Sequence, residues 1–183
     1  VDFTWDRQGR LWGVDNGTDR MGDDYPPEEL NLIRDGGFYG WPYAHGDCRP
    51  DPRFGSRRPD RVRECIAPAF TMPAHSAPLG IAFYDAEQFP AGYRGDLFVA
   101  LHGSWNRSTP VGYKVIRIHF ENGQPERATD FITGFGLGTG AWARPVGVLV
   151  GPDGSLFVSD DRAGHIWRVR YIGESASQRS TMR

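Results

Sequence analysis

The sequence predicts an all-β fold, and three observations support that class. Its 183 residues include 24 glycines and 14 prolines, and 13% of the residues are aromatic, a mixture that suits short strands joined by turns. A turn rich in Asp and Gly, followed by a strand of alternating apolar residues, occurs at three places. Helical periodicity is nearly absent.

The repeated unit can be followed along the chain. The first copy spans residues 5–15, residues 151–160 repeat it closely, and residues 95–100 form a weaker copy. A further strand is predicted after each copy, over residues 29–33, 114–118 and 165–169. The strand at 114–118 runs into the turn Glu121-Asn122-Gly123, and a return strand is predicted around residues 130–132. Strand–turn–strand units spaced by tens of residues are typical of β-propeller blades.

About three blades are therefore expected, whereas propellers close with typically four to eight. We expect residues 1–173 to form the C-terminal blades of a propeller that this chain does not close alone. The remaining blades would come from missing N-terminal sequence or from a second chain. The start at Val1, inside what reads as a strand and without an initiating Met, favours a fragment over a processed mature chain. The Ser- and Arg-rich segment 174–183 is predicted to be a mobile tail.

Charge and hydropathy argue against two classes of partner. A formal net charge of −2 provides no general basic field for nucleic acid or anionic lipid. No apolar run approaches the roughly 20 residues that a membrane-spanning helix requires.

The two cysteines, Cys48 and Cys65, lie in a segment dense in Arg, Pro and Asp. A disulfide between them would close a loop of about 16 residues and stabilise the fold by about 3 kcal/mol. Such a bridge implies an oxidising compartment, periplasmic or extracellular. The alternative is two unrelated free thiols, and no Cys or His spacing suggests a zinc site.

Several ordered blocks carry a family resemblance. They are residues 14–18, 23–24 and 29–42, then 102–107 continuing into 112–115, and finally 144–148. Together they resemble the pyrroloquinoline-quinone (PQQ)-dependent soluble aldose dehydrogenases, in particular the L-sorbosone and pyranose dehydrogenase branch. The resemblance extends over about residues 3–171. It implies a six-bladed propeller that oxidises a sugar, passes hydride to PQQ held by calcium, and reduces an external electron acceptor.

In that family two consecutive backbone carbonyls bind the calcium, and the matching positions are Gly17 and Thr18. Calcium takes six to eight oxygen ligands, and carbonyls from a tight glycine turn can converge on it. Several acidic residues surround this turn: Asp15, Asp19, Asp23, Asp24, Glu28 and Glu29. The alternative is a solvated acidic loop without an ion.

The resemblance also implies cofactor contacts. Arg144 matches an arginine that contacts the quinone. A guanidinium group is a suitable partner for the anionic cofactor, because it is planar, permanently charged and can donate two parallel hydrogen bonds. Trp142 replaces a second arginine of another branch, so aromatic contact is expected there instead. His102 stands where some relatives carry a cofactor-binding lysine, Arg107 follows on the next loop, and His75 precedes a strand near the central cleft. The alternatives are a surface arginine at 144 and a packed strand-end histidine at 102.

Two further segments have open interpretations. The turn from Gly36 to Pro42 is rich in glycine and aromatic residues, so a ring could approach its backbone closely. A corner between blades, packed by Tyr39 and Trp41, is the interpretation we favour for Trp41 and Pro42. We expect His45 in a loop and His165 on an outer strand, both without a functional role.

The family's general base is a histidine of an earlier blade, and no matching stretch occurs here. We therefore expect the base upstream of Val1, and whether this chain alone is an enzyme stays open. Sugar oxidation requires such a base for the hydroxyl proton while hydride leaves the adjacent carbon. The alternative functions are a non-catalytic propeller binding module and a calcium-dependent, lactonase-like hydrolase.

Overall fold

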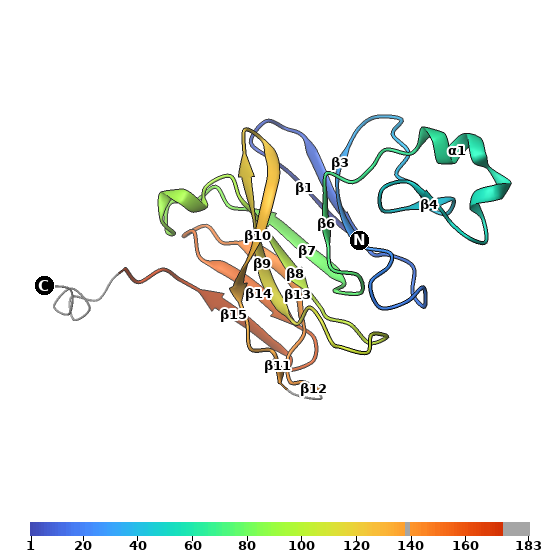
Figure 1. Ribbon diagram of the computed structural model, residues 1–183. Helices are drawn as coiled ribbons and strands as arrows, with labels where there is room; N and C mark the ends of the chain where they lie inside the picture. Colours follow the sequence, from blue (N-terminus) through green and yellow to red (C-terminus); the bar gives the residue numbers. More distant parts are fainter. Residues whose placement is uncertain (138–139, 174–183) are drawn as a thin grey trace, which may run out of the picture.

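The computed structural model describes residues 1–137 and 140–173, and three antiparallel sheets make up most of it (Figure 1). The first sheet has the order β1-β2-β3-β6, with β1 (Asp2–Trp5), β2 (Leu11–Asp15), β3 (Glu28–Ile33) and β6 (Phe70–Met72). The second has the order β10-β9-β8-β7, with β7 (Pro78–Phe83), β8 (Leu97–Leu101), β9 (Lys114–Glu121) and β10 (Gln124–Ile132). The third contains β13 (Pro145–Val150), β14 (Leu156–Asp160) and β15 (His165–Val169) in that order.

The three predicted repeats are confirmed as strands of separate sheets. The apolar part of each repeat forms β2, β8 or β14, and the strands predicted after them are β3, β9 and β15. The turns follow the expected chemistry: Gly9, Gly95 and Gly154 have φ between 73° and 87°, a region that side chains with a Cβ rarely adopt. Local turn signals therefore place one hairpin in each sheet.

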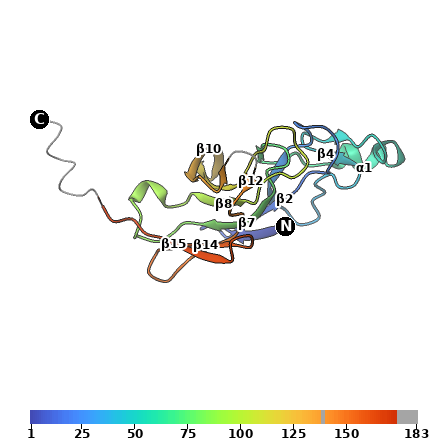
Figure 2. The same cartoon turned by 90° about the horizontal axis from the view of Figure 1, so that it is seen from below.

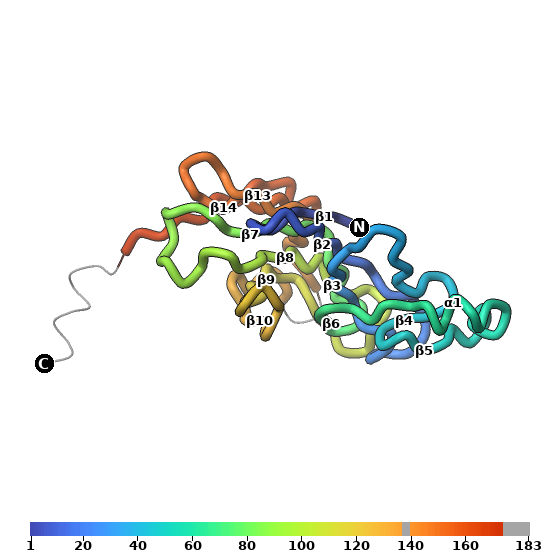
Figure 3. The backbone as a smooth tube through the Cα atoms, turned by 90° about the horizontal axis from the view of Figure 1, so that it is seen from above, coloured from blue at the N-terminus to red at the C-terminus, as the bar shows by residue number. Residues whose placement is uncertain are grey.

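The first strands of the three sheets, β1, β7 and β13, lie side by side at the centre of the molecule (Figure 3). The Ile81 amide of β7 donates to the Asp2 carboxylate of β1 at 3.0 Å. On the other side of β7, a Cβ built on Gly80 would meet the backbone of Val146, Gly147 and Val148 in β13. Successive sheets are thus packed through their innermost strands, as blades of a propeller are.

Two apolar clusters join the sheets. The first lies between the first and second sheets and contains Trp12, Val14, Leu30, Met72, Ile81, Phe83, Leu97, Val99, Leu101, Ile116 and Ile118. The second joins the second and third sheets through Tyr84, Phe89, Phe98, Val115, Leu156 and Val158. The Tyr84 hydroxyl, fully buried, donates to the Gly154 carbonyl at 3.0 Å and so connects the two sheets with a polar bond as well.

Residues 44–65 form a separate lobe, which we call the disulfide lobe. It contains β4 (Ala44–His45), β5 (Arg49–Pro50), the 3-10 turn η1 (Gly55–Arg57) and α1 (Pro59–Glu64). The predicted bridge between Cys48 and Cys65 is present, with the two Cα atoms 5.7 Å apart. The helix α1 was not predicted, because it buries no residue and so has no apolar periodicity to detect. Figure 2 shows this lobe at one end of the molecule and β15 toward the other.

The remaining elements are short. The 3-10 turn η2 (Ala91–Tyr93) lies between β7 and β8, and β11 (Gly136–Leu137) pairs with β12 (Gly140–Ala141) before the third sheet. The predicted tail, residues 174–183, falls outside the described residues. In the part of the chain that the structure describes, no helix has the length and apolar character of a membrane span.

Candidate functional site

Loops from all three sheets meet at one end of the molecule, which we call the site end. The link runs through Ala77, just before β7. Its amide donates to Glu28, at the start of β3, at 3.1 Å, and its carbonyl accepts the amide of His102, after β8, at 2.9 Å. The carbonyl of His102 in turn accepts the Arg144 guanidinium, before β13, at 3.1 Å. Residues far apart in the sequence are thus brought together by packing of the sheets.

The Gly17–Thr18 turn follows β2 at this end, and a hydrogen bond to the Glu28 side chain holds it in place. The Gly17 amide donates to the Glu28 carboxylate at 2.6 Å, and the Glu28 side chain is almost fully buried. Burial raises the pKa of Glu28, and the hydrogen bonds from the Gly17 and Ala77 amides oppose that rise without cancelling it. A Cβ on Gly17 would lie 2.8 Å from Pro26 Cγ and 3.0 Å from the Pro26 carbonyl oxygen, so the close approach of the two segments favours glycine here.

The oxygen atoms of this turn are of the kind that calcium takes as ligands. Within the described residues, neither the Gly17 nor the Thr18 carbonyl accepts a hydrogen bond, and the buried Thr18 hydroxyl has no partner. A buried hydroxyl without a partner is uncommon, and hard cations such as calcium take carbonyl and hydroxyl oxygens as ligands. In residues 1–137 and 140–173 no group of three or more His, Cys, Asp or Glu side chains could hold a metal ion. The fit therefore depends on the backbone carbonyls.

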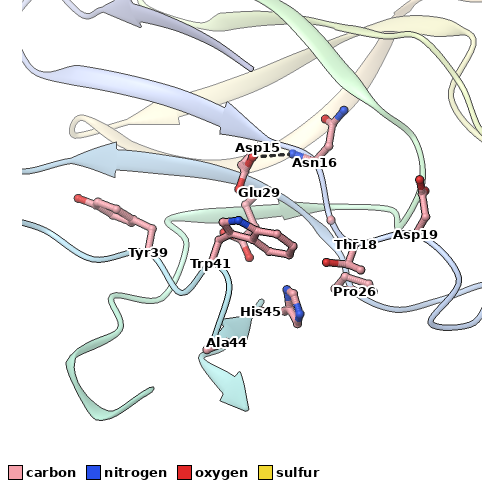
Figure 4. Close-up of a pocket in the computed structure, with 11 residues that line it drawn as sticks. Asp15, Asn16, Thr18, Asp19, Pro26, Glu29, Tyr39, Trp41, Ala44 and His45 are labelled. Carbon is pink, nitrogen blue, oxygen red and sulfur yellow. Dashed lines mark hydrogen bonds between the residues drawn. The ribbon is translucent and has the colours of Figure 1, made fainter. Parts of the chain in front are cut away.

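A pocket of about 400 Å³ opens beside this turn (Figure 4). Its wall is formed by the Gly17–Thr18 turn, the end of β2, the start of β3 and the disulfide lobe. The lining residues are Asp15, Asn16, Gly17, Thr18, Asp19, Pro26, Glu29, Tyr39, Trp41, Ala44 and His45. The pocket thus combines carboxylates with exposed aromatic faces next to the candidate calcium turn.

The two aromatic side chains of the wall and its histidine were not predicted as site residues. Trp41 is 59% exposed and lines the pocket, and its ring lies 6.0 Å from the His45 ring of the disulfide lobe. The Tyr39 hydroxyl donates to the Leu32 carbonyl at 2.7 Å and ties the turn to the end of β3. His45, expected in a loop, is buried in β4, with Nε2 2.7 Å from the Asp51 carboxylate. No local pattern links His45 to Asp51, because the lobe's tertiary fold creates that contact.

One carboxylate, Glu29, connects β3 to the disulfide lobe, and a second, Asp51, holds the lobe together internally. Glu29 accepts the Gly46 amide at 2.7 Å and the Asn31 side-chain amide at 3.1 Å, and burial raises its pKa. Burial also acts to raise the pKa of Asp51, but hydrogen bonds from His45 and from the amides of Arg53 and Phe54 outweigh it and lower the pKa to about 2.

The predicted residues His75 and Arg107 hold the loop that follows the Gly17–Thr18 turn. His75 is buried, with Nε2 2.7 Å from the Gly22 carbonyl oxygen. Arg107 donates to the Asp23 carbonyl at 2.5 Å and to the Asp24 carboxylate at 2.7 Å, while its Nε donates to Thr109. The structure therefore brings both side chains to the site end, where their contacts are to the protein's own loop.

The predicted residues His102 and Arg144 form a second group, between the second and third sheets. The Arg144 guanidinium donates from Nε to the His102 carbonyl and from Nη2 to the Gly103 carbonyl at 2.6 Å, and it lies over the Tyr113 ring. Within the described residues its Nη1 has no hydrogen-bond partner. Trp142 packs edge-on against Phe135 and Trp167, and its indole nitrogen donates to the Gly134 carbonyl at 2.7 Å.

Known proteins similar to this chain include a family model and two curated relatives. The TrAA12-like family model matches residues 60–171, more than half of the chain. A Borreliella burgdorferi protein without an assigned function is 38% identical over 165 residues, which are 88% of this chain and 43% of that protein. The PQQ-dependent pyranose dehydrogenase of Coprinopsis cinerea is 33% identical over 125 residues, covering 57% of this chain and 16% of that enzyme.

Solved structures agree with the fold. The holo form of the PQQ domain of the Coprinopsis cinerea enzyme matches 93% of this chain and 53% of its own chain, with a TM-score of 0.70 and 23% identity. A calcium structure of a Trichoderma reesei enzyme of carbohydrate-active family AA12 matches 86% of this chain and 48% of its own, with a TM-score of 0.70 and 24% identity.

The chain spans less than half the length of the curated relatives it matches and about half of the structural ones. Over that span its mostly antiparallel sheets match part of a propeller-fold dehydrogenase. The chain belongs to the TrAA12-like family and is related to the PQQ-dependent sugar dehydrogenases.

Proposed function

We propose that this chain is part of a quinoprotein dehydrogenase that oxidises a sugar, an aldose or a sorbosone-like compound, with calcium-held PQQ as hydride acceptor. The observation that carries the proposal is the Gly17–Thr18 turn, which lines a pocket and has no hydrogen bond to either carbonyl within the described residues. The buried Glu28 carboxylate holds this turn by accepting the Gly17 amide. Membership of the TrAA12-like family supports the same proposed function.

The chain's own residues would have distinct tasks. The carbonyls of Gly17 and Thr18 bind calcium. Arg144, with Nη1 left over from its two carbonyl contacts, and His102 would contact the anionic quinone. His75 and Arg107 keep the loop 19–24 in place between them. When bound, PQQ supplies the hydride acceptor, and calcium polarises its quinone oxygens.

The general base of this proposal is a histidine that the whole protein supplies outside this chain. The substrate hydroxyl loses its proton to that base as hydride leaves the adjacent carbon. The Cys48–Cys65 bridge supports a periplasmic or extracellular location, where disulfides persist. An external electron acceptor would be the redox partner of the whole protein.

The test uses the full-length protein that contains this chain. After addition of PQQ and calcium, we expect dye reduction with aldoses and calcium-dependent binding of PQQ. Arg144→Gln is expected to weaken PQQ binding about tenfold, because a charged hydrogen bond contributes about 1.5 kcal/mol or more. Glu121→Gln, an exposed carboxylate at the end of β9, is the matched control and should change nothing. Absence of both dye reduction and calcium-dependent PQQ binding would refute the proposal.

A further inference from the structure

We propose that Asp161 is a positioning residue that orients the His102 imidazole, so that Nδ1 is the ring nitrogen left to meet the cofactor. The inference rests on the proposed function of His102 as a cofactor contact. It goes beyond that proposal because Asp161 lies 59 residues away in the sequence and on another sheet.

The backbone of His102 is fixed on both sides. Its amide donates to the Ala77 carbonyl at 2.9 Å, and its carbonyl accepts Arg144 Nε at 3.1 Å. The next residue, Gly103, donates to the Ser76 carbonyl at 3.0 Å and accepts Arg144 Nη2. With its main chain held at these four points, His102 has little freedom other than rotation of its side chain.

Asp161 removes that remaining freedom. His102 Nε2 lies 3.0 Å from one Asp161 carboxylate oxygen and 3.2 Å from the other. A carboxylate only accepts hydrogen bonds, so Nε2 must carry the proton in this contact. In the neutral ring the proton is then absent from Nδ1, which has no partner among the described residues. A carboxylate behind a histidine commonly sets the tautomer and orientation of the ring in this way.

The position of Asp161 is itself well determined. The preceding residue, Asp160, ends β14, is buried, and accepts the amides of Arg144, Arg162 and Ala163, each at 3.0 Å. These bonds shape the turn after β14 and attach it to the start of β13. Asp161 therefore points from a hydrogen-bonded turn of the third sheet to a histidine at the end of the second sheet. The His102–Asp161 pair exists only where these two sheets are packed together.

The geometry gives the pair a task that Asp161 cannot perform alone. Its carboxylate is more than half exposed and would repel an anionic quinone if it met the cofactor directly. Bound to Nε2, it instead faces the neutral or protonated imidazole, and the imidazole presents Nδ1 in one orientation. Preorganisation of this kind improves binding because the ligand does not have to order the side chain.

The first measurement concerns the ring alone. In full-length protein labelled with 15N-histidine, with the His102 signal assigned by its loss in His102→Ala, we expect one tautomer, protonated on Nε2. Asp161→Ala is expected to yield a mixture of tautomers, and the control Glu121→Gln to match wild type. A His102 ring protonated on Nδ1 in the wild-type protein, or an unchanged single tautomer in Asp161→Ala, would overturn the proposal.

The second measurement is a double-mutant cycle on PQQ affinity at saturating calcium. Asp161→Ala is expected to weaken PQQ binding about tenfold in the wild-type background and to have no effect in the His102→Ala background. An equal loss in both backgrounds would mean that Asp161 does not act through His102. If no variant, wild type included, binds PQQ with calcium, the proposed function fails, and the tautomer measurement still decides the role of Asp161.

Discussion

Replacing Gly80 by alanine tests the packing of the innermost strands, on which the whole site end depends. The added methyl group would lie 2.7 Å from the Cα of Gly147 and 2.9 Å from the nitrogen of Val148, and it would also overlap the Val146 carbonyl oxygen. Contact between carbon atoms is favourable at about 3.5–4.0 Å, so β7 and β13 would have to separate by about 1 Å. All three neighbours are backbone atoms, and no side-chain rotation can relieve the overlap.

Overpacking of this kind costs about 1–3 kcal/mol, and we expect Gly80→Ala to lower the free energy of unfolding by about that amount. The measurement is equilibrium unfolding in urea, with midpoints compared at equal slopes. Gly92→Ala is the matched control, because no atom lies within 4 Å of its Cβ position. That variant should stay within about 0.5 kcal/mol of wild type. Equal stability of the two variants would show that β7 and β13 are not packed as described.

Two further predictions concern buried carboxylates. The pKa of Asp51 is lowered from its ordinary value of 3.8 to about 2, so its stabilisation is present above pH 4 and lost as the pH falls to 2. We expect Asp51→Asn to be less stable than wild type by about 2 kcal/mol at pH 6 and equally stable near pH 2, in unfolding curves measured across this range. A stability difference between the two proteins that stays constant from pH 6 to pH 2 would contradict a stabilising role of the ionised Asp51 carboxylate. For Glu28→Gln, only one acceptor oxygen remains for the Gly17 and Ala77 amides, and we expect calcium affinity to fall about tenfold in titration calorimetry. Unchanged affinity would show that Glu28 does not hold the calcium turn.

The parts of the fold that could be predicted from the sequence are those with local causes. The hairpins at residues 5–15 and 151–160 were found because an Asp-Gly turn and period-two apolar residues are contiguous in the chain. The Cys48–Cys65 bridge was found because the cysteines are the chain's only two. Helix α1 could not be predicted, since a single short helix without a buried face leaves no periodic signal.

The residues of the candidate site likewise fall into those that could be predicted from the sequence and those that depend on tertiary packing. Gly17, Thr18, His102 and Arg144 were singled out by resemblance, and the structure brings them to one end, although their roles stay predictions. Trp41 and His45 were given no role, because their place at the pocket depends on how residues 44–65 fold back onto β3. The Asp161 contact to His102 was invisible for a similar reason: it arises where two sheets meet.

The joining of the sheets at Ala77 also couples ligand binding to folding. Contacts to this residue come from Glu28 of the first sheet and from His102, which Arg144 ties to the third. A ligand that needs groups from several sheets binds only when the sheets are packed, and it therefore stabilises their packing. At a concentration one hundred times its Kd, such a ligand adds about 2.7 kcal/mol to the folded state. If the proposed function holds, thermal shift with and without calcium and quinone would report on the same contacts that hold the sheets together.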